Sequence, residues 1–218
     1  MIHNMTRVPA VILLLGICFC LPLHAGSLTV QVFNQKHQPL ADAVIYLTSD
    51  ETPAMPVNNH FEIEQKDKIF KPFVTVLPIG AKTMFPNRDG IGHHVYSFSP
   101  VKKFQLPLSE YESTDTVTFD QAGVVTVGCN IHDWMVAYIY VVDTPYYAKS
   151  VKDGAAMIDN VPDGDYEIHV AHPGMKSVTA MTKRIDMAVD TKASLEFSLD
   201  IKPEYYWRPS PRTEEEIY

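Results

Sequence analysis

The chain has 218 residues, of which 46% are hydrophobic and 20% are charged, and its formal net charge is −8. An acidic chain of this kind lacks the basic surface that binds phosphates, so nucleic acid is excluded as a partner. Its length allows one large hydrophobic core or two small ones.

The first 25 residues predict a secretory signal. Arg7 supplies the positive flank, 8–23 is an apolar run, and Ala25 is a candidate cleavage residue. Cleavage would leave 17 basic and 26 acidic side chains, a net charge of −9. We expect a periplasmic protein with no stable membrane insertion after cleavage. An uncleaved anchor stays open, because Leu23 is a poor residue two positions before the cut.

The rest of the chain predicts an all-β protein. Its runs are short, rich in Val, Ile, Thr, Tyr and Phe, and broken by Pro and Gly, and none shows a long helical period. The polar stretch 48–68 predicts a linker or loop, and 162–165, Pro-Asp-Gly-Asp, predicts a turn. The expected strands are 28–33, 43–47, 73–77, 83–85, 93–98, 117–119, 124–129, 135–142, 155–158, 166–171, 176–180 and 193–199.

Residues 128–135 read Gly-Cys-Asn-Ile-His-Asp-Trp-Met and carry the most informative motif. Cys129, His132 and Met135 lie within seven residues, and His93 and His94 lie on an earlier predicted strand. Two imidazoles, one thiolate and a weak axial thioether are the ligands of blue-copper centres. The sequence therefore predicts one mononuclear type 1 copper.

The cysteine count favours the same interpretation. Cys18 and Cys20 fall inside the predicted signal, so cleavage leaves Cys129 as a lone thiol in an exported chain. A lone thiol in an oxidising compartment invites intermolecular pairing, unless a metal occupies the sulfur. The alternative is that Cys129 is a small buried hydrophobic residue.

These motifs carry a resemblance to a known family. Residues 117–129, followed by His132 and Met135, resemble the copper-binding end of cupredoxins, and 86–95 resemble their upstream histidine strand. The spacing Cys-x-x-His-x-x-Met is similar to the short loop of amicyanin-like proteins, and 85–148 resembles cupredoxin-domain proteins labelled methylamine utilisation proteins. The resemblance implies a Greek-key β-sandwich with metal ligands His93, Cys129, His132 and Met135.

His93 and His94 are alternatives for the first ligand. Successive strand side chains point to opposite faces, so both cannot reach one metal without distortion. The resemblance places the ligand at His93, and puts His94 where the family has an Asn that ties the two ligand loops together. Two further positions depart from the family, since Ile131 and Asp133 stand where short-loop cupredoxins carry Pro.

Trp134 and Met135 also have more than one interpretation. Trp134 could cover the metal, form part of a docking surface, or simply pack as a loop aromatic. Met135 could fill a gap in the core instead of binding the metal axially.

The outer segments resemble a second module that is split in sequence. Residues 28–47 resemble the first hairpin, and 153–170 the later strands, of carboxypeptidase-regulatory-like, transthyretin-type β-sandwiches. Neither has enough strands to be stable alone, so we predict that they pair around an inserted cupredoxin domain. His169 and His172 are interpreted as structural or exposed. The predicted organisation is a signal at 1–25, first strands and linker at 26–65, cupredoxin domain at 66–144, remaining strands at 145–201, and a polar tail at 202–218.

The sequence thus predicts an exported one-electron carrier that is not an enzyme, because four ligands leave no coordination position open for a substrate. Its expected partner is a redox protein, such as a dehydrogenase or a cytochrome. Two alternatives stay open. The first is a periplasmic copper-binding or delivery protein, and the second is a structural β-sandwich module with a vestigial site.

Overall fold

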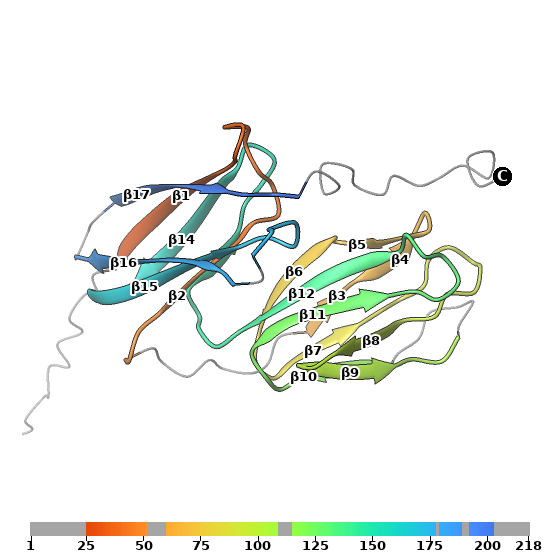
Figure 1. The fold of residues 1–218 in the computed structure, drawn as a ribbon. Coiled ribbons are helices and arrows are strands. Elements are labelled where there is room, and N and C mark those ends of the chain that lie inside the picture. The colour runs from red at the N-terminus through yellow and green to blue at the C-terminus, as the bar shows by residue number, and fades with distance from the viewer. Residues whose placement is uncertain (1–24, 52–59, 109–114, 178, 189–191, 203–218) are drawn as a thin grey trace, which may run out of the picture.

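The computed structural model describes residues 25–51, 60–108, 115–177, 179–188 and 192–202, which form two all-β sandwiches side by side (Figure 1). The predicted signal and nearly all of the predicted polar tail lie outside these residues. Within the described ranges, no helix is long and apolar enough to cross a membrane.

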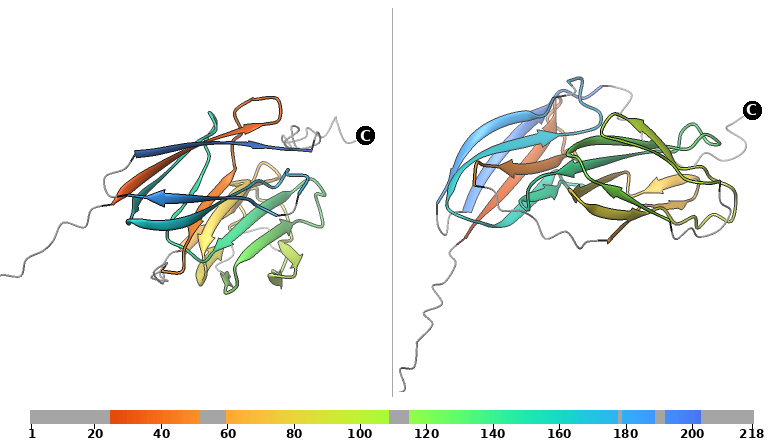
Figure 2. Two further views of the ribbon diagram at one scale, coloured as in Figure 1. Left: turned by 60° about the vertical axis from the view of Figure 1, so that its left-hand side comes forward. Right: turned by 90° about the horizontal axis from the view of Figure 1, so that it is seen from below.

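The outer sandwich is built from both ends of the described chain, as the views in Figure 2 also show. Its two sheets have the strand orders β14-β1-β17 and β13-β2-β15-β16. The strands are β1 (Gly26–Asn34), β2 (Val44–Thr48), β13 (Tyr147–Lys149), β14 (Ala155–Val161), β15 (Gly164–Ala171), β16 (Met181–Met187) and β17 (Lys192–Leu199).

Strand pairing joins the two flanking segments as the sequence predicts. β1 is antiparallel to β14, with Leu28 opposite Ile158, and parallel to β17 along its length. β2 is antiparallel to β15, with Leu47 opposite Ile168. Alternate side chains of β1 and β15 are buried in one core, because period-2 apolar residues line one face of a strand.

The inner sandwich lies between these segments in sequence. Its sheets have the orders β10-β7-β3 and β6-β12-β11-β8-β9, and β4 pairs with β5 as a separate hairpin. The strands are β3 (His60–Glu62), β4 (Glu64–Lys66), β5 (Ile69–Lys71), β6 (Val74–Pro78), β7 (Ala81–Met84), β8 (Tyr96–Ser99), β9 (Lys102–Gln105), β10 (Thr116–Phe119), β11 (Gly123–Gly128) and β12 (Val136–Val142).

Strand β12 connects the inner core to the interface between the sandwiches. Ala137 and Ile139 on one face are buried in the inner core. Tyr140 and Val142 on the other face pack in a separate cluster with Val44 of the outer sandwich. Burial on both faces explains why this strand is a nearly continuous apolar run.

The predicted linker at 48–68 is wrong for its second half. β3 and β4 lie there and belong to the inner sandwich, where Ile63 is fully buried and Gln65 is 3% exposed. These strands have three residues each, which is too short for an alternating pattern to stand out among charged side chains. The strands β5, β9 and β13 have three or four residues and escaped prediction because they too are short.

Two other strand predictions need correction. The strand expected at 176–180 is displaced, and β16 begins at Met181. β16 is an edge strand with mostly exposed polar side chains, so it has little of the alternation on which the prediction depends. The strand expected from His93 begins at Tyr96, so His93 and His94 precede it.

Candidate metal centre

An ordered loop between β7 and β8 presents His93. The Asn87 side chain accepts from the Asp89 N–H at 3.0 Å and donates to the Ile91 carbonyl at 2.7 Å, which closes a compact turn. Gly90, inside that turn, has a φ of 66°, a conformation that favours glycine. The turn leaves the His93 side chain pointing inward, with the residue 2% exposed.

A second loop, between β11 and β12, presents the other three predicted ligands, Cys129, His132 and Met135. The Cys129 N–H donates to the Met135 carbonyl at 3.2 Å, and the Met135 N–H donates to the His132 carbonyl at 2.9 Å. The first bond continues the β11–β12 ladder into the loop base, and the second turns the chain at its tip. Cys129 is 3% exposed, whereas His132 is half-buried.

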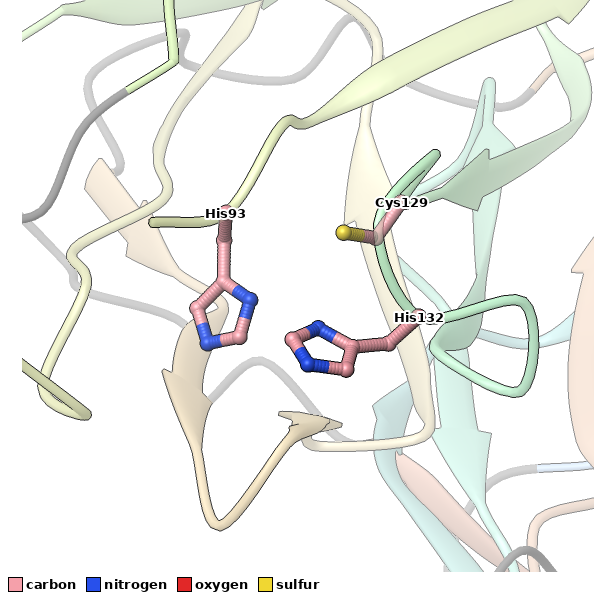
Figure 3. A group of neighbouring side chains, drawn as sticks. All are labelled: His93, Cys129 and His132. Carbon is pink, nitrogen blue, oxygen red and sulfur yellow. The ribbon is translucent and has the colours of Figure 1, made fainter. Parts of the chain in front are cut away.

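His93, Cys129 and His132 meet between the two loops (Figure 3). One donor atom from each lies within 4.8 Å of the others. The two imidazole rings have centroids 5.0 Å apart and planes inclined by 61°. His94 is not in this group. It is 8% exposed and its ring lies 5.8 Å from that of Tyr96.

The ring nitrogens show which atoms are available to a metal. The Nε2 atom of His93 lies 2.7 Å from a carboxylate oxygen of Asp89. The Nδ1 atoms of His93 and His132 are buried and have no hydrogen-bond partner. In Figure 3 these nitrogens lie on the side of each ring that faces the Cys129 sulfur. A buried polar atom without a partner is costly, and a metal ion would satisfy both.

The surroundings favour the anionic form of Cys129. Burial alone raises the pKa of the thiol, but the neighbouring His93 ring and the backbone N–H groups of His94, Ile131 and His132 outweigh it and lower the pKa to about 7. A partly ionised thiol at neutral pH is prepared for metal ligation, because the thiolate is the ligand.

The two histidines respond in opposite directions. Burial lowers the pKa of His93, but Cys129 and Asp89 outweigh burial, so the pKa is raised overall. The pKa of His132 is lowered by burial and by the positive charges of His93 and Lys68. A neutral His132 keeps its Nδ1 lone pair available.

Sequence reasoning missed Asp89. Its carboxylate accepts from the backbone N–H groups of Asp67 and Lys68 at 2.5 and 2.9 Å as well as contacting His93. These bonds lower its pKa although burial acts to raise it. The available signal was its position four residues before His93 in a Gly-containing turn, but Asp in such turns usually binds its own backbone.

Met135 and Trp134 lie beside the cluster. Met135 is 1% exposed and belongs to the inner core, so axial ligation by its thioether stays a prediction. The Trp134 ring is 5.2 Å from that of His132, and its Nε1–H donates to the Lys68 carbonyl at 3.0 Å. Trp134 therefore covers one side of His132.

His169 and His172 have protein partners in the outer sandwich. His169 Nε2 lies 2.8 Å from Thr48 Oγ1, and its ring stacks on Tyr46 at 4.5 Å. His172 Nδ1 accepts from the Gly174 N–H at 2.9 Å. These contacts are those of structural histidines.

No family model and no curated protein matches the chain. Solved structures that it resembles include a Cu(I) form of an amicyanin variant, at 16% identity and TM-score 0.36, covering 45% of this chain and 98% of that one. A purple cupredoxin from Nitrosopumilus maritimus is 19% identical, with TM-score 0.35, and covers 39% of this chain and 100% of the other. A copper nitrite reductase from Thermus scotoductus is 20% identical, with TM-score 0.37, and covers 44% of this chain and 25% of the other.

These scores and identities are too low to transfer a function. The cupredoxin-like fold of the inner sandwich is instead assigned from how its own sheets and loops are arranged. Two β-sheets enclose one core, Cys129 and His132 lie on the loop between neighbouring strands, and His93 comes from an upstream loop.

Proposed function

We propose that the protein is an exported mononuclear blue-copper protein that carries single electrons. The observation that carries this proposal is the convergence of His93, Cys129 and His132, with one donor atom from each within 4.8 Å of the others. A thiolate and two imidazoles suit both Cu(I) and Cu(II), so copper held there would supply a reversible one-electron couple.

The protein's own groups fit this metal. The Asp89 carboxylate occupies Nε2 of His93, which leaves the Nδ1 lone pair directed into the cluster. The lowered pKa of Cys129 supplies the thiolate near neutral pH. Burial of His93 and Cys129 keeps water away from the sulfur, which protects it from oxidation.

Burial of the donors supports an electron carrier over a copper-delivery protein. Cys129 and His93 are 3% and 2% exposed, and the loops that hold them are closed by hydrogen bonds. Metal exchange with a partner would need at least one loop to open. A purely structural module is disfavoured, because two buried Nδ1 atoms without partners would lower its stability without serving a function.

We propose no substrate reaction. With Met135 as a fourth, axial ligand, the coordination positions are filled by the protein. Export fits the lone cysteine, since Cys129 is the free cysteine among the described residues and is buried. The proposed location is the periplasm, and the proposed partner is a redox protein such as a dehydrogenase or a cytochrome.

The test is to add one equivalent of Cu(II) to purified protein and record its visible spectrum, followed by voltammetry. The expected result is an intense thiolate-to-copper band and a reversible one-electron wave. A copper complex without that band would contradict the blue-copper site. A band combined with rapid copper loss to a chelator would favour delivery instead.

A further inference from the structure

The turn between β4 and β5 contacts the loops of both His ligands. Asp67 and Lys68 form a two-residue connection, with Lys66 opposite Ile69 and φ values of 59° and 56°. Positive φ at both central residues is the geometry of a type I′ hairpin turn. Neither residue is glycine, so this backbone is held in an uncommon conformation by its surroundings.

On one side, the turn is bonded to the His93 loop. The two backbone N–H groups of Asp67 and Lys68 donate to separate oxygens of the Asp89 carboxylate, at 2.5 and 2.9 Å. The Asp89 oxygen that accepts from Lys68 also lies 2.7 Å from His93 Nε2. The Asp89 side chain is 9% exposed and that of His93 is fully buried, so little water competes for the contact between them.

On the other side, the turn is bonded to the His132 loop. The Lys68 carbonyl accepts from Trp134 Nε1–H at 3.0 Å, and the Trp134 ring packs against His132. Lys68 therefore donates toward one ligand loop and accepts from the other. The link is short because it uses the backbone of a single residue.

We propose that the backbone of Asp67 and Lys68 and the carboxylate of Asp89 form a clasp that fixes the separation of the two ligand loops, with Asp89 as the positioning residue for His93. The His94 side chain does not supply such a tie through Nδ1, which is buried and has no hydrogen-bond partner. The clasp supplies a tie between the same loops from a different part of the chain. Its effect on copper rests on the proposed function, whereas its contacts are formed by the protein alone.

The clasp predicts how Asp89→Asn acts. The amide nitrogen of Asn is a donor, so Asn can accept only through Oδ1 and cannot accept all three bonds that the two carboxylate oxygens of Asp89 accept from Asp67, Lys68 and His93. We expect copper affinity to fall about 10–100-fold, as for other groups that orient a metal-bound histidine. Asp67→Asn is the matched control, since it also removes one negative charge beside the site but keeps the backbone N–H. It breaks the exposed Asp67–Lys71 ion pair, so its effect should stay below about fivefold.

A second readout needs no copper. Hydrogen exchange of the Trp134 indole N–H, assigned by its absence in Trp134→Phe, reports the far side of the clasp. In Asp89→Asn this exchange should become faster, because the turn loses its anchor, while Asp67→Asn should leave it unchanged. Thermal unfolding of each copper-free variant separates a local change from general unfolding.

The outcomes are distinct. Equal copper affinity and equal indole exchange in the Asp89 and Asp67 variants would overturn the clasp. Faster indole exchange only in Asp89→Asn, in a protein whose copper complex lacks the thiolate band, would uphold the clasp and contradict the blue-copper function.

Discussion

The two sandwiches differ in whether their buried polar atoms have hydrogen-bond partners. Six buried side-chain atoms among the described residues have no hydrogen-bond partner, and all six are in the inner sandwich: Gln65 Oε1, Thr75 Oγ1, Thr83 Oγ1, His93 Nδ1, His94 Nδ1 and His132 Nδ1. By contrast, His169 and His172 of the outer sandwich have hydrogen-bond partners within 2.9 Å. Histidine alone therefore does not mark a site. A buried histidine nitrogen without a partner does so only where other donor atoms converge on it, since His94 Nδ1 also lacks a partner but lies outside the cluster.

The two sandwiches also differ in the length of their strands. The outer sandwich has several strands of seven to nine residues, and the long register between β1 and β17 has no interruption. The inner sandwich breaks its sheets into shorter strands around two ligand loops. We infer that the outer sandwich contributes stability, whereas the inner sandwich tolerates locally destabilising features around its site.

The largest expected effect is that of Cys129→Ser, which changes the site in the inner sandwich. A serine oxygen gives no thiolate charge transfer, so the intense visible band should be lost completely. The measurement is the spectrum with one equivalent of Cu(II). A blue serine variant would exclude the site at this position.

His93→Ala and His94→Ala test which buried histidine nitrogen matters. His93→Ala should lose the blue site or open it to solvent, because His93 lies in the cluster with Cys129 and His132. His94→Ala should keep the colour with a modest shift in potential, because His94 lies outside it. Each variant is titrated with Cu(II) under the same conditions, and the reverse result would move the first ligand by one residue.

A pair of core substitutions tests whether the two sandwiches have independent roles in stability and in the copper site. Ile168 in the outer core and Ile139 in the inner core are both fully buried. Replacing either with Ala should lower the free energy of unfolding by about 2–5 kcal/mol, through lost burial and the cavity left behind. Denaturant unfolding measures this loss. Only Ile139→Ala should also broaden the copper band, because β12 follows the loop that carries His132. Equal spectral changes would contradict independent roles for the two sandwiches.

The effect of pH on the copper-free protein follows from the pKa of Cys129, which folding lowers to about 7. The stabilisation from the folded thiolate is present above the ordinary thiol pKa and declines as pH falls through about 7. It should not exceed about 2–3 kcal/mol. The pKa of His93 is raised, so its contribution to stability is instead lost as pH rises. The difference in urea midpoint between wild type and Cys129→Ser, measured below and above pH 7, isolates the cysteine. A difference that does not change with pH would contradict the lowered pKa.

Much of the site was predictable because its chemistry is concentrated in sequence. The seven residues from Cys129 to Met135 carry a thiol, an imidazole and a thioether, and that combination has few other uses. The pairing of the outer segments was predictable because each has too few strands to be stable alone and both resemble parts of one kind of β-sandwich. His93 could be favoured over His94 only through the family resemblance, and the strand assigned to both begins after them.

The clasp was not predictable by the same reasoning. Asp67 and Lys68 lie in a charged stretch without apolar periodicity, and they act through backbone groups that any residue possesses. Asp89 is one acidic residue among 26 in the chain, and its partners are 21 to 22 residues earlier. Such contacts depend on how the loops meet in three dimensions, which local pattern does not encode.

Met135→Leu is expected to have the smallest effect. Leu matches Met in volume, so the inner core should lose less than about 1.5 kcal/mol of stability. Copper should stay bound and blue, because Cys129 and the two histidines remain. The reduction potential should rise, since removing a weak sulfur donor destabilises Cu(II) more than Cu(I), and the axial ligand is a known determinant of potential. Voltammetry at fixed pH measures the shift, with Ile139→Val as a control for a small change in core packing. An unchanged potential would mean that Met135 only fills the core, and the four-ligand site would reduce to the three residues that meet between the loops.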